Sequence, residues 1–284
     1  MRATPRAPLR PRQDAHSVDI FKRSWEVYQT VVAHDSVHHK QLFGAIRDYL
    51  EGRPGDKLSI LDLGCGDAGC LASIIAGTPS LRDRITSYTG IDASAPALAL
   101  CRTNMAAALG GGGGGAAGAA EIDLREGGML EGLAAAAERG ERFDVVLASL
   151  SLHHLSEAEK ARAVEAVGRV LAPGGAFVIC DIFLLPGWSR DEFMRQYHAD
   201  VYEVNGGWQG QDKAGKDLLW AHISNYDFPV ELSHYQAAAA AARAAPGGAF
   251  ISAEGRVLTE VFVYKVAAWE APPAAAAEAA AAAS

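Results

Sequence analysis

Apolar and polar positions alternate along the chain in blocks that predict strands separated by helices. Short apolar runs that predict buried strands occupy residues 58–63, 85–91, 121–125, 143–150 and 176–182. Apolar residues at helical spacing predict two helices within 18–51, and single helices over 70–76, 96–109, 130–139 and 156–172. Ser156 begins the last helix with Glu159 three residues on, a capping box, and Pro173 with two glycines is expected to end it.

Helices of this length between strands predict parallel βαβ units in a doubly wound sheet. A second capping box at Ser189 begins an aromatic-rich helical stretch that runs to about residue 245. Residues 250–253 and 258–266, joined across Glu254-Gly255, predict an antiparallel hairpin that closes the sheet. The expected fold class is α/β, with a mostly parallel seven-stranded sheet, a C-terminal antiparallel hairpin and a helical cap.

Shifts in composition suggest where the chain divides. The first 17 residues are rich in arginine, residues 110–120 consist of glycine and alanine, and the C-terminal end is nearly all alanine. Homopolymeric glycine cannot hold a fixed backbone cheaply, so 110–120 is expected to be a surface insertion. The predicted segments are a disordered tail (1–17), an N-terminal helical cap (18–56), a sheet core (57–183), an aromatic helical cap for substrate (184–245), the hairpin (246–268) and a disordered tail (269–284).

Composition narrows the class of protein. The 284 residues are 49% hydrophobic and 21% charged, which excludes fully disordered and collagen-like chains. The net charge of −8 disfavours nucleic acid as a partner, and no apolar run is long enough to predict a membrane span. Four cysteines without metal-site spacing indicate reduced thiols and a cytoplasmic location. Four arginines before the first acid, Asp14, leave organellar import open.

The segment with the clearest chemistry, Asp62 to Gly69 (DLGCGDAG), directly follows the first strand. Its glycines allow a tight turn, and the next helix offers free N–H groups to an anion. The segment also satisfies the G-x-G-x-x-G dinucleotide pattern, which is weak evidence by itself. Asp62 discriminates between ligands, because a carboxylate here repels a pyrophosphate and attracts an ammonium group. One carboxylate beside several N–H groups suits the amino-acid end of S-adenosylmethionine; the alternative is a structural turn without a ligand.

A second acidic residue, Asp92, ends the second strand. A carboxylate at this position can accept both hydroxyl groups of a ribose. The alternative is that Asp92 caps the following helix, although Ser94 is available for that role.

Four motifs in chain order resemble those of class I S-adenosylmethionine-dependent methyltransferases: LDLGCGDAG, GIDAS, FDVVLASLSLHHL and LAPGGAFVICD, within residues 58–183. The resemblance implies a Rossmann-like fold, S-adenosylmethionine as cofactor, and in-line displacement of the sulfonium methyl group. By position it implies the following cofactor contacts: Asp62, Gly64 and Gly66, with Cys65 in the same turn, at the methionine end; Asp92 at the ribose; Ala93 and Met129 at the adenine; and Ser149 near the sulfonium. From the first helix, we expect Tyr28 to contact the cofactor or the acceptor. Many members have an acid just before Met129, where this chain has Gly128.

Candidate bases stand after two strands: His153 and His154 after the fourth, and Asp181 at the end of the fifth. We favour His154 and Asp181 as catalytic residues, and a base is needed only if the acceptor is a hydroxyl or ammonium group. The alternatives are that the histidine pair anchors a turn and that Asp181 accepts a hydrogen bond from a loop backbone.

Aromatic and histidine side chains are concentrated outside the predicted sheet, and we expect them to enclose a small-molecule methyl acceptor. They are Trp25, Tyr28, His34, His38 and His39 in the N-terminal helices, and Trp188, Tyr197, His198, Tyr202, Trp208, Trp220, His222, Tyr226, His234 and Tyr235 after the fifth strand. The alternative for any one of them is packing in the core of the cap. We predict no metal site, because the His38-His39 pair lacks acidic partners.

Two other functions use the same fold pattern. A nicotinamide-dependent oxidoreductase predicts an apolar residue at position 62 and no Pro-Gly-Gly before the fifth strand, and this chain has Asp62 and Pro173-Gly174-Gly175. A degenerate methyltransferase fold that acts as a binding subunit is mildly favoured by Gly128. The intact glycine turn and Asp92 argue against it.

Overall fold

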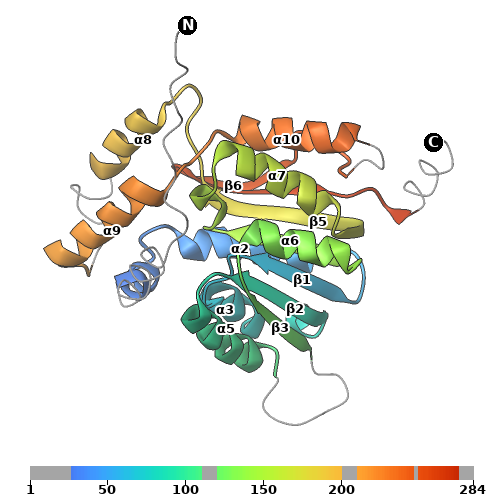
Figure 1. Cartoon of the computed structure of the whole chain (residues 1–284). Coiled ribbons are helices and arrows are strands. Elements are labelled where there is room, and N and C mark those ends of the chain that lie inside the picture. The colour runs from blue at the N-terminus through green and yellow to red at the C-terminus, as the bar shows by residue number, and fades with distance from the viewer. Residues whose placement is uncertain (1–26, 111–119, 200–209, 246–248, 275–284) are drawn as a thin grey trace, which may run out of the picture.

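The computed structural model describes residues 27–110, 120–199, 210–245 and 249–274 (Figure 1). The strands are β1 (Leu58–Leu63), β2 (Ile85–Asp92), β3 (Glu121–Glu126), β4 (Phe143–Ser149), β5 (Leu171–Ile182), β6 (Arg256–Val261) and β7 (Tyr264–Glu270). The helices are α2 (His39–Glu51), α3 (Gly69–Ala76), α4 (Pro79–Arg82), α5 (Ala95–Ala108), α6 (Met129–Glu138), η1 (Leu152–His154, a 3₁₀ helix), α7 (Glu157–Gly168), α8 (Arg190–Tyr197), α9 (Lys213–Tyr226) and α10 (Leu232–Ala244). Residues 27–33 are also helical.

The seven strands form one sheet in the order β3-β2-β1-β4-β5-β7-β6. The neighbours from β3 to β5 are parallel, and β7 pairs antiparallel with both β5 and β6. The expected fold class is therefore confirmed. Asp62 on β1 lies level with Gly90 on β2, so the carboxyl ends of these strands meet at one edge of the sheet.

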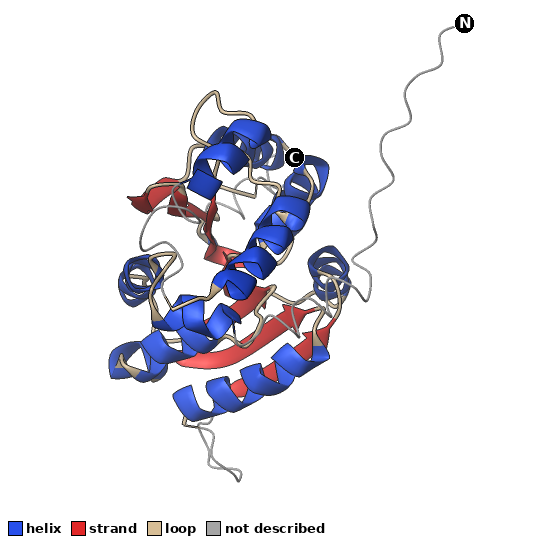
Figure 2. Ribbon diagram, turned by 90° about the vertical axis from the view of Figure 1, so that its left-hand side faces the viewer, coloured by secondary structure: helices blue, strands red, loops and turns tan. Residues whose placement is uncertain are grey.

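Helices cover both faces of the sheet (Figure 2). One hydrophobic core contains buried side chains of α2, α3 and α5, and the other contains those of α6, α7 and α10. We expected α2 and α10 in caps, but they lie in the layers that flank the sheet. Burial explains the difference, because Leu42 and Ile46 of α2 and Ala239 of α10 are fully inaccessible to solvent.

The remaining helices of the expected cap, α8 and α9, project from one end of the sheet (Figure 1). Arg190, at the start of α8, joins them. Its guanidinium donates hydrogen bonds to the carbonyl oxygens of Ser224 and Asp227 at the end of α9, at 2.7 and 2.9 Å.

The expected hairpin turn at Glu254-Gly255 is wrong. The two strands are β6 and β7, and they turn at Phe262-Val263, with Val261 paired to Tyr264. Phe262 has φ +54°, a conformation that normally favours glycine. Because phenylalanine and not glycine adopts it here, the sequence gives no local signal of the turn. The sheet also runs on past residue 268 to Glu270, because Trp269 is buried.

The helix expected to reach Ala172 ends at Gly168 instead. Val170 and Leu171 are both buried in a core, and after a short turn Leu171 begins β5. The Pro-Gly-Gly segment consequently lies within β5, at an irregularity in its pairing with β4.

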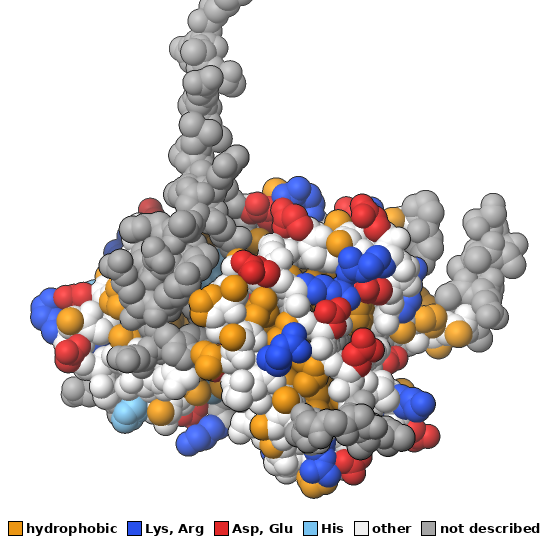
Figure 3. Space-filling model, turned by 60° about the horizontal axis from the view of Figure 1, so that its bottom comes forward, with side chains coloured by type: hydrophobic (Ala, Val, Ile, Leu, Met, Phe, Trp, Pro, Cys, Tyr) orange, Lys and Arg blue, Asp and Glu red, His pale blue; other side chains and the backbone are white. Residues whose placement is uncertain are grey.

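Several expectations lie outside the described residues. They concern the whole N-terminal tail (1–17), most of the glycine-alanine insertion, the last ten residues, and Trp25, Tyr202 and Trp208. Within the described part, no helix has the length and apolar character to cross a membrane. Acidic and basic side chains intermingle over the face shown in Figure 3.

Candidate active site

A cavity of about 470 Å³ opens at the carboxyl ends of β1, β2 and β4. Every residue predicted to hold the cofactor lines it, and so does His154. Asp181, the second predicted catalytic residue, does not. The parallel sheet explains this convergence, because ligands in doubly wound folds bind beyond the carboxyl ends of the strands.

The glycine turn after β1 forms the floor of the cavity. Gly64 and Gly66 have φ values of +68° and +53°, which side chains rarely adopt. The N–H groups of Gly64 and Cys65 donate to the carbonyl oxygen of Ile91, at 2.8 and 3.1 Å, and so tie the turn to β2. A β-carbon on Gly64 would lie only 2.6 Å from that of Ser151, so only glycine fits there.

Asp62 carries a buried carboxylate at the end of β1, with 1% of its surface exposed. Its Oδ2 accepts a hydrogen bond from the hydroxyl of Tyr88 at 2.9 Å, and its Oδ1 has no partner within the described residues. Burial raises the pKa of Asp62 to about 7, and the negative charge of Asp92 adds to the effect. An unpartnered buried oxygen on a cavity wall is satisfied when a cationic donor binds.

Asp92 links the ends of β1 and β2. Its Oδ2 accepts a hydrogen bond from the N–H of Gly66 at 2.9 Å, and its Oδ1 accepts one from the N–H of Ser94 at 2.8 Å. Ser94 caps α5, since its hydroxyl accepts from the N–H of Ala97. The cap role falls to Ser94, and Asp92 remains at the cavity wall.

Gly128 and Met129 begin α6 at the predicted adenine end. Glu131 reaches back toward Gly128, and its Oε2 lies where the β-carbon of a larger residue would come. Because this oxygen is the end of a flexible side chain, it could move aside for a larger residue, and the contact does not by itself require glycine at position 128.

The opposite end of the cavity is built by α9 and the residues after it. His222 and Tyr226 line the cavity, as does Phe228, and the ring centre of His154 lies 5.3 Å from that of His222. Burial lowers the pKa of His222 to about 4 and that of His154 well below its ordinary value, so both imidazoles are neutral. Tyr235 does not line the cavity and packs edge-on against Phe183 in the core. For this residue the alternative role, packing in a core, is the one that the structure shows.

His153 and Asp181 form a buried pair behind the cavity wall. The Nδ1 of His153 lies 2.5 Å from Asp181 Oδ1, and Asp181 Oδ2 accepts the backbone N–H of His153 at 3.0 Å. Burial alone would lower the pKa of His153, but the carboxylates of Asp181 and Asp227 outweigh it and raise the pKa. The structure therefore gives Asp181 the loop-bonding role that was the alternative to catalysis.

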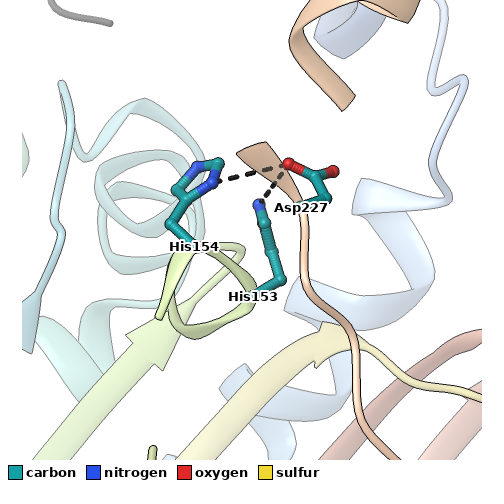
Figure 4. Close-up of side chains that lie close together, drawn as sticks. All are labelled: His153, His154 and Asp227. Carbon is teal, nitrogen blue, oxygen red and sulfur yellow. Dashed lines mark ion pairs between the residues drawn. The ribbon is translucent and has the colours of Figure 1, made fainter. Parts of the chain in front are cut away.

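Asp227 joins this cluster and was missed by sequence reasoning (Figure 4). Its Oδ1 lies 3.4 Å from His154 Nδ1 and 3.7 Å from His153 Nε2. Burial raises the pKa of Asp227 to about 6. No motif surrounds this residue in the sequence, and its only local signal is an acidic residue directly after a helix.

Comparisons with known proteins agree with this fold. A family model described as a methyltransferase domain matches residues 61–177. An uncharacterised methyltransferase from Synechocystis is 30% identical over 136 residues, which are 48% of this chain and 51% of that protein. The chain thus spans about half the length of this relative.

Two solved structures share the fold at low identity. An O-methyltransferase family protein from Burkholderia thailandensis matches with a TM-score of 0.51 and 15% identity, over 90% of this chain and 69% of that one. A "possible exported protein" from Bordetella parapertussis matches with a TM-score of 0.51 and 18% identity, over 83% and 67%.

Proposed function

We propose that this chain, whose residues 61–177 match a methyltransferase domain, is a class I S-adenosylmethionine-dependent methyltransferase and transfers the methyl group of S-adenosylmethionine to a small-molecule acceptor. The observation that carries the proposal is the Oδ1 of Asp62 on the cavity wall, which has no hydrogen-bond partner in the part of the chain that the structure describes. An ammonium group satisfies this oxygen, whereas a pyrophosphate would be repelled by it.

The residues of the turn and of β2 fit the proposed cofactor. Asp62 would accept hydrogen bonds from its ammonium group, and the turn at Gly64 and Gly66 leaves room for the methionine chain. Asp92 would accept from the ribose hydroxyls, and Met129 would pack against the adenine. The bound cofactor supplies a methyl group on a sulfonium, which is an excellent leaving group.

The protein's own contribution is then alignment, which can supply up to about 10 kcal/mol of a reaction barrier. Ser149 and Tyr28 line the cavity beside the glycine turn, and His154 and His222 line its far end. We propose that the acceptor lies between these groups, on the side of α9. Acceptance of its proton by His154 stays a prediction.

The test is calorimetry on the whole chain with S-adenosylmethionine, S-adenosylhomocysteine and NAD. We expect both sulfur compounds to bind and NAD not to bind. Asp62→Ala should abolish binding of the sulfur compounds, while Asp191→Asn on the exposed start of α8 should leave it unchanged. Binding of NAD alone would support the oxidoreductase instead. Binding without transfer of a labelled methyl group to any of a panel of phenols, amines and thiols would favour a binding subunit.

A further inference from the structure

Two histidines and one aspartate bring three potential ligand atoms together next to the far end of the cavity, which His154 lines (Figure 4). These atoms are His153 Nε2, His154 Nδ1 and Asp227 Oδ1, and all lie within 4.8 Å of one another. We propose that they bind a divalent transition-metal ion. The set of two imidazoles and one carboxylate is one that such ions prefer.

Spacing is the first argument. Asp227 Oδ1 is buried and has no hydrogen-bond partner within the described residues, although it faces both imidazole nitrogens. A point equidistant from the three atoms lies at most about 2.4 Å from each, close to the roughly 2.0–2.2 Å of zinc–ligand bonds. The separations of 3.4 and 3.7 Å suit an ion between the atoms better than direct hydrogen bonds.

His153 also has a carboxylate partner on its other ring nitrogen, as ligating histidines commonly do. Asp181 holds the Nδ1 of this imidazole, which leaves Nε2 directed at Asp227. A carboxylate on the far nitrogen of a ligating histidine is the usual outer-shell arrangement, and it fixes the ring and raises its basicity. The pair of His153 and Asp181, which the proposed methyl transfer does not use, thereby gains a role.

Two features oppose the ion and limit its affinity. His154 Nδ1 lies 3.2 Å from the carbonyl oxygen of Tyr226, and this contact must give way when Nδ1 becomes a ligand. The cations of Lys160 and Arg190 also lie near the cluster, where they donate to backbone carbonyl groups. Against them stand the charges of Asp181 and Asp227, which together match a divalent ion.

The ligand set defines the class of ion. Two imidazole nitrogens suit Zn²⁺, Fe²⁺ and Co²⁺, whereas Mg²⁺ and Ca²⁺ require mainly oxygen ligands. Three protein ligands leave at least one coordination position open. Of the three ligands, His154 lines the cavity whereas His153 and Asp227 do not, so we propose that an acceptor in the cavity reaches the open position on the His154 side. The class of acceptor is then a hydroxyl compound that binds the ion through oxygen.

This inference about the acceptor rests on the proposed function, whereas the ion site itself does not. With the ion bound, His154 is a ligand and no longer the predicted base. The proposed ion site also differs from our prediction that the chain has no metal site. Asp227 is far from the two histidines in the sequence and joins them only in the folded chain.

The test is titration of the whole chain with Zn²⁺ by calorimetry and with Co²⁺ by visible absorption, with Mg²⁺ as the negative control. We expect one Zn²⁺ per chain and the absorption bands of protein-bound Co²⁺. Asp227→Asn should weaken Zn²⁺ binding at least tenfold, and Asp181→Asn by about 10–100-fold. Asp191→Asn, on the exposed start of α8, should leave binding unchanged.

Equal Zn²⁺ affinity of the wild type and Asp227→Asn, or no binding by the wild type, overturns the proposal. If so, the position of the buried His153 imidazole between the carboxylates of Asp181 and Asp227 explains, without a metal ion, why these residues lie together. His154→Gln, on the cavity wall, repeats the test if Asp227→Asn does not fold. Binding of S-adenosylhomocysteine, measured on the same samples, separates failure of the ion site from failure of the proposed function.

Discussion

Replacing Asp62 with asparagine should stabilise the ligand-free protein and destroy its binding site at the same time. Asparagine has nearly the same shape, and its side-chain oxygen can still accept the hydrogen bond from Tyr88. What disappears is a buried negative charge with one unpartnered oxygen. That charge is costly to the empty protein, and the proposed ligand needs it.

The size of the effect follows from the pKa. Moving the pKa of Asp62 from 3.8 to about 7 corresponds to about 4 kcal/mol against the ionised form. The buried amide N–H of asparagine lacks a partner and returns about 1–3 kcal/mol of this. At pH 8 we therefore expect Asp62→Asn to raise the free energy of unfolding by about 2 kcal/mol.

The dependence of stability on pH gives the sign of the effect of Asp62→Asn. Below pH 4 the carboxyl group is protonated in both the folded and the unfolded chain, so it contributes no difference. Between pH 4 and 7 the unfolded chain releases this proton and the folded chain retains it, so the stability of the wild type falls as pH rises. Above pH 7 the penalty is complete. The advantage of Asp62→Asn should thus grow from pH 4 to 7 and then level off.

Urea denaturation followed by circular dichroism at pH 5, 6, 7 and 8 measures this difference. Calorimetry with S-adenosylhomocysteine should show at least tenfold weaker binding at pH 8, since a charge-assisted hydrogen bond contributes about 1.5–3 kcal/mol. Tyr88→Phe is the matched control, because it removes the one hydrogen bond that the Asp62 side chain has within the described residues and should destabilise the protein. If Asp62→Asn is less stable than the wild type at pH 8, or the difference does not change with pH, the reasoning is refuted.

Three further substitutions test other parts of the site. Gly64→Ala should lower the free energy of unfolding, measured in urea, more than Gly174→Ala does. Both residues have positive φ, but only at Gly64 would the new β-carbon lie against Ser151. Equal losses of stability would mean that this contact has no effect. Asp92→Asn should weaken binding of S-adenosylhomocysteine in calorimetry about tenfold, or about 1.4 kcal/mol, and unchanged affinity would remove Asp92 from the ribose site. Lys160→Met should cost about 1–3 kcal/mol of unfolding free energy, because the buried ammonium group donates to two backbone carbonyl groups, and a neutral result in urea would contradict that role.

The proposed cofactor end of the cavity was predictable because it is built locally. Asp62 and the glycines follow one strand without interruption, and their positions depend on the strand end and on backbone conformations that glycine alone adopts readily. Asp92 ends the neighbouring parallel strand, so the sheet brings it level with the turn. The order of strands and helices was therefore enough to bring these residues together.

Errors arose where packing between distant segments outweighed a local signal. Glu254-Gly255 has the composition of a hairpin turn, but the chain turns at Phe262-Val263 and buries Val263 and Trp269. Likewise, α10 has the alanine-rich sequence of a peripheral helix, yet it packs in the layer that covers the sheet. In each case the burial of apolar area in the whole fold determined the result.

The proposed acceptor end shows why a motif cannot identify a substrate. His153 and His154 are adjacent and identical in type, but the first pairs with Asp181 behind the wall and the second lines the cavity. Which histidine faces inward depends on the strand ends around them. What they face depends on Asp227, which is 73 residues beyond His154 in the sequence and is held by α9 and its contact with Arg190. Since α9 carries no motif, the chemistry of the acceptor depends on how this helix packs, and substitutions along α9 should change the acceptor before they change the cofactor.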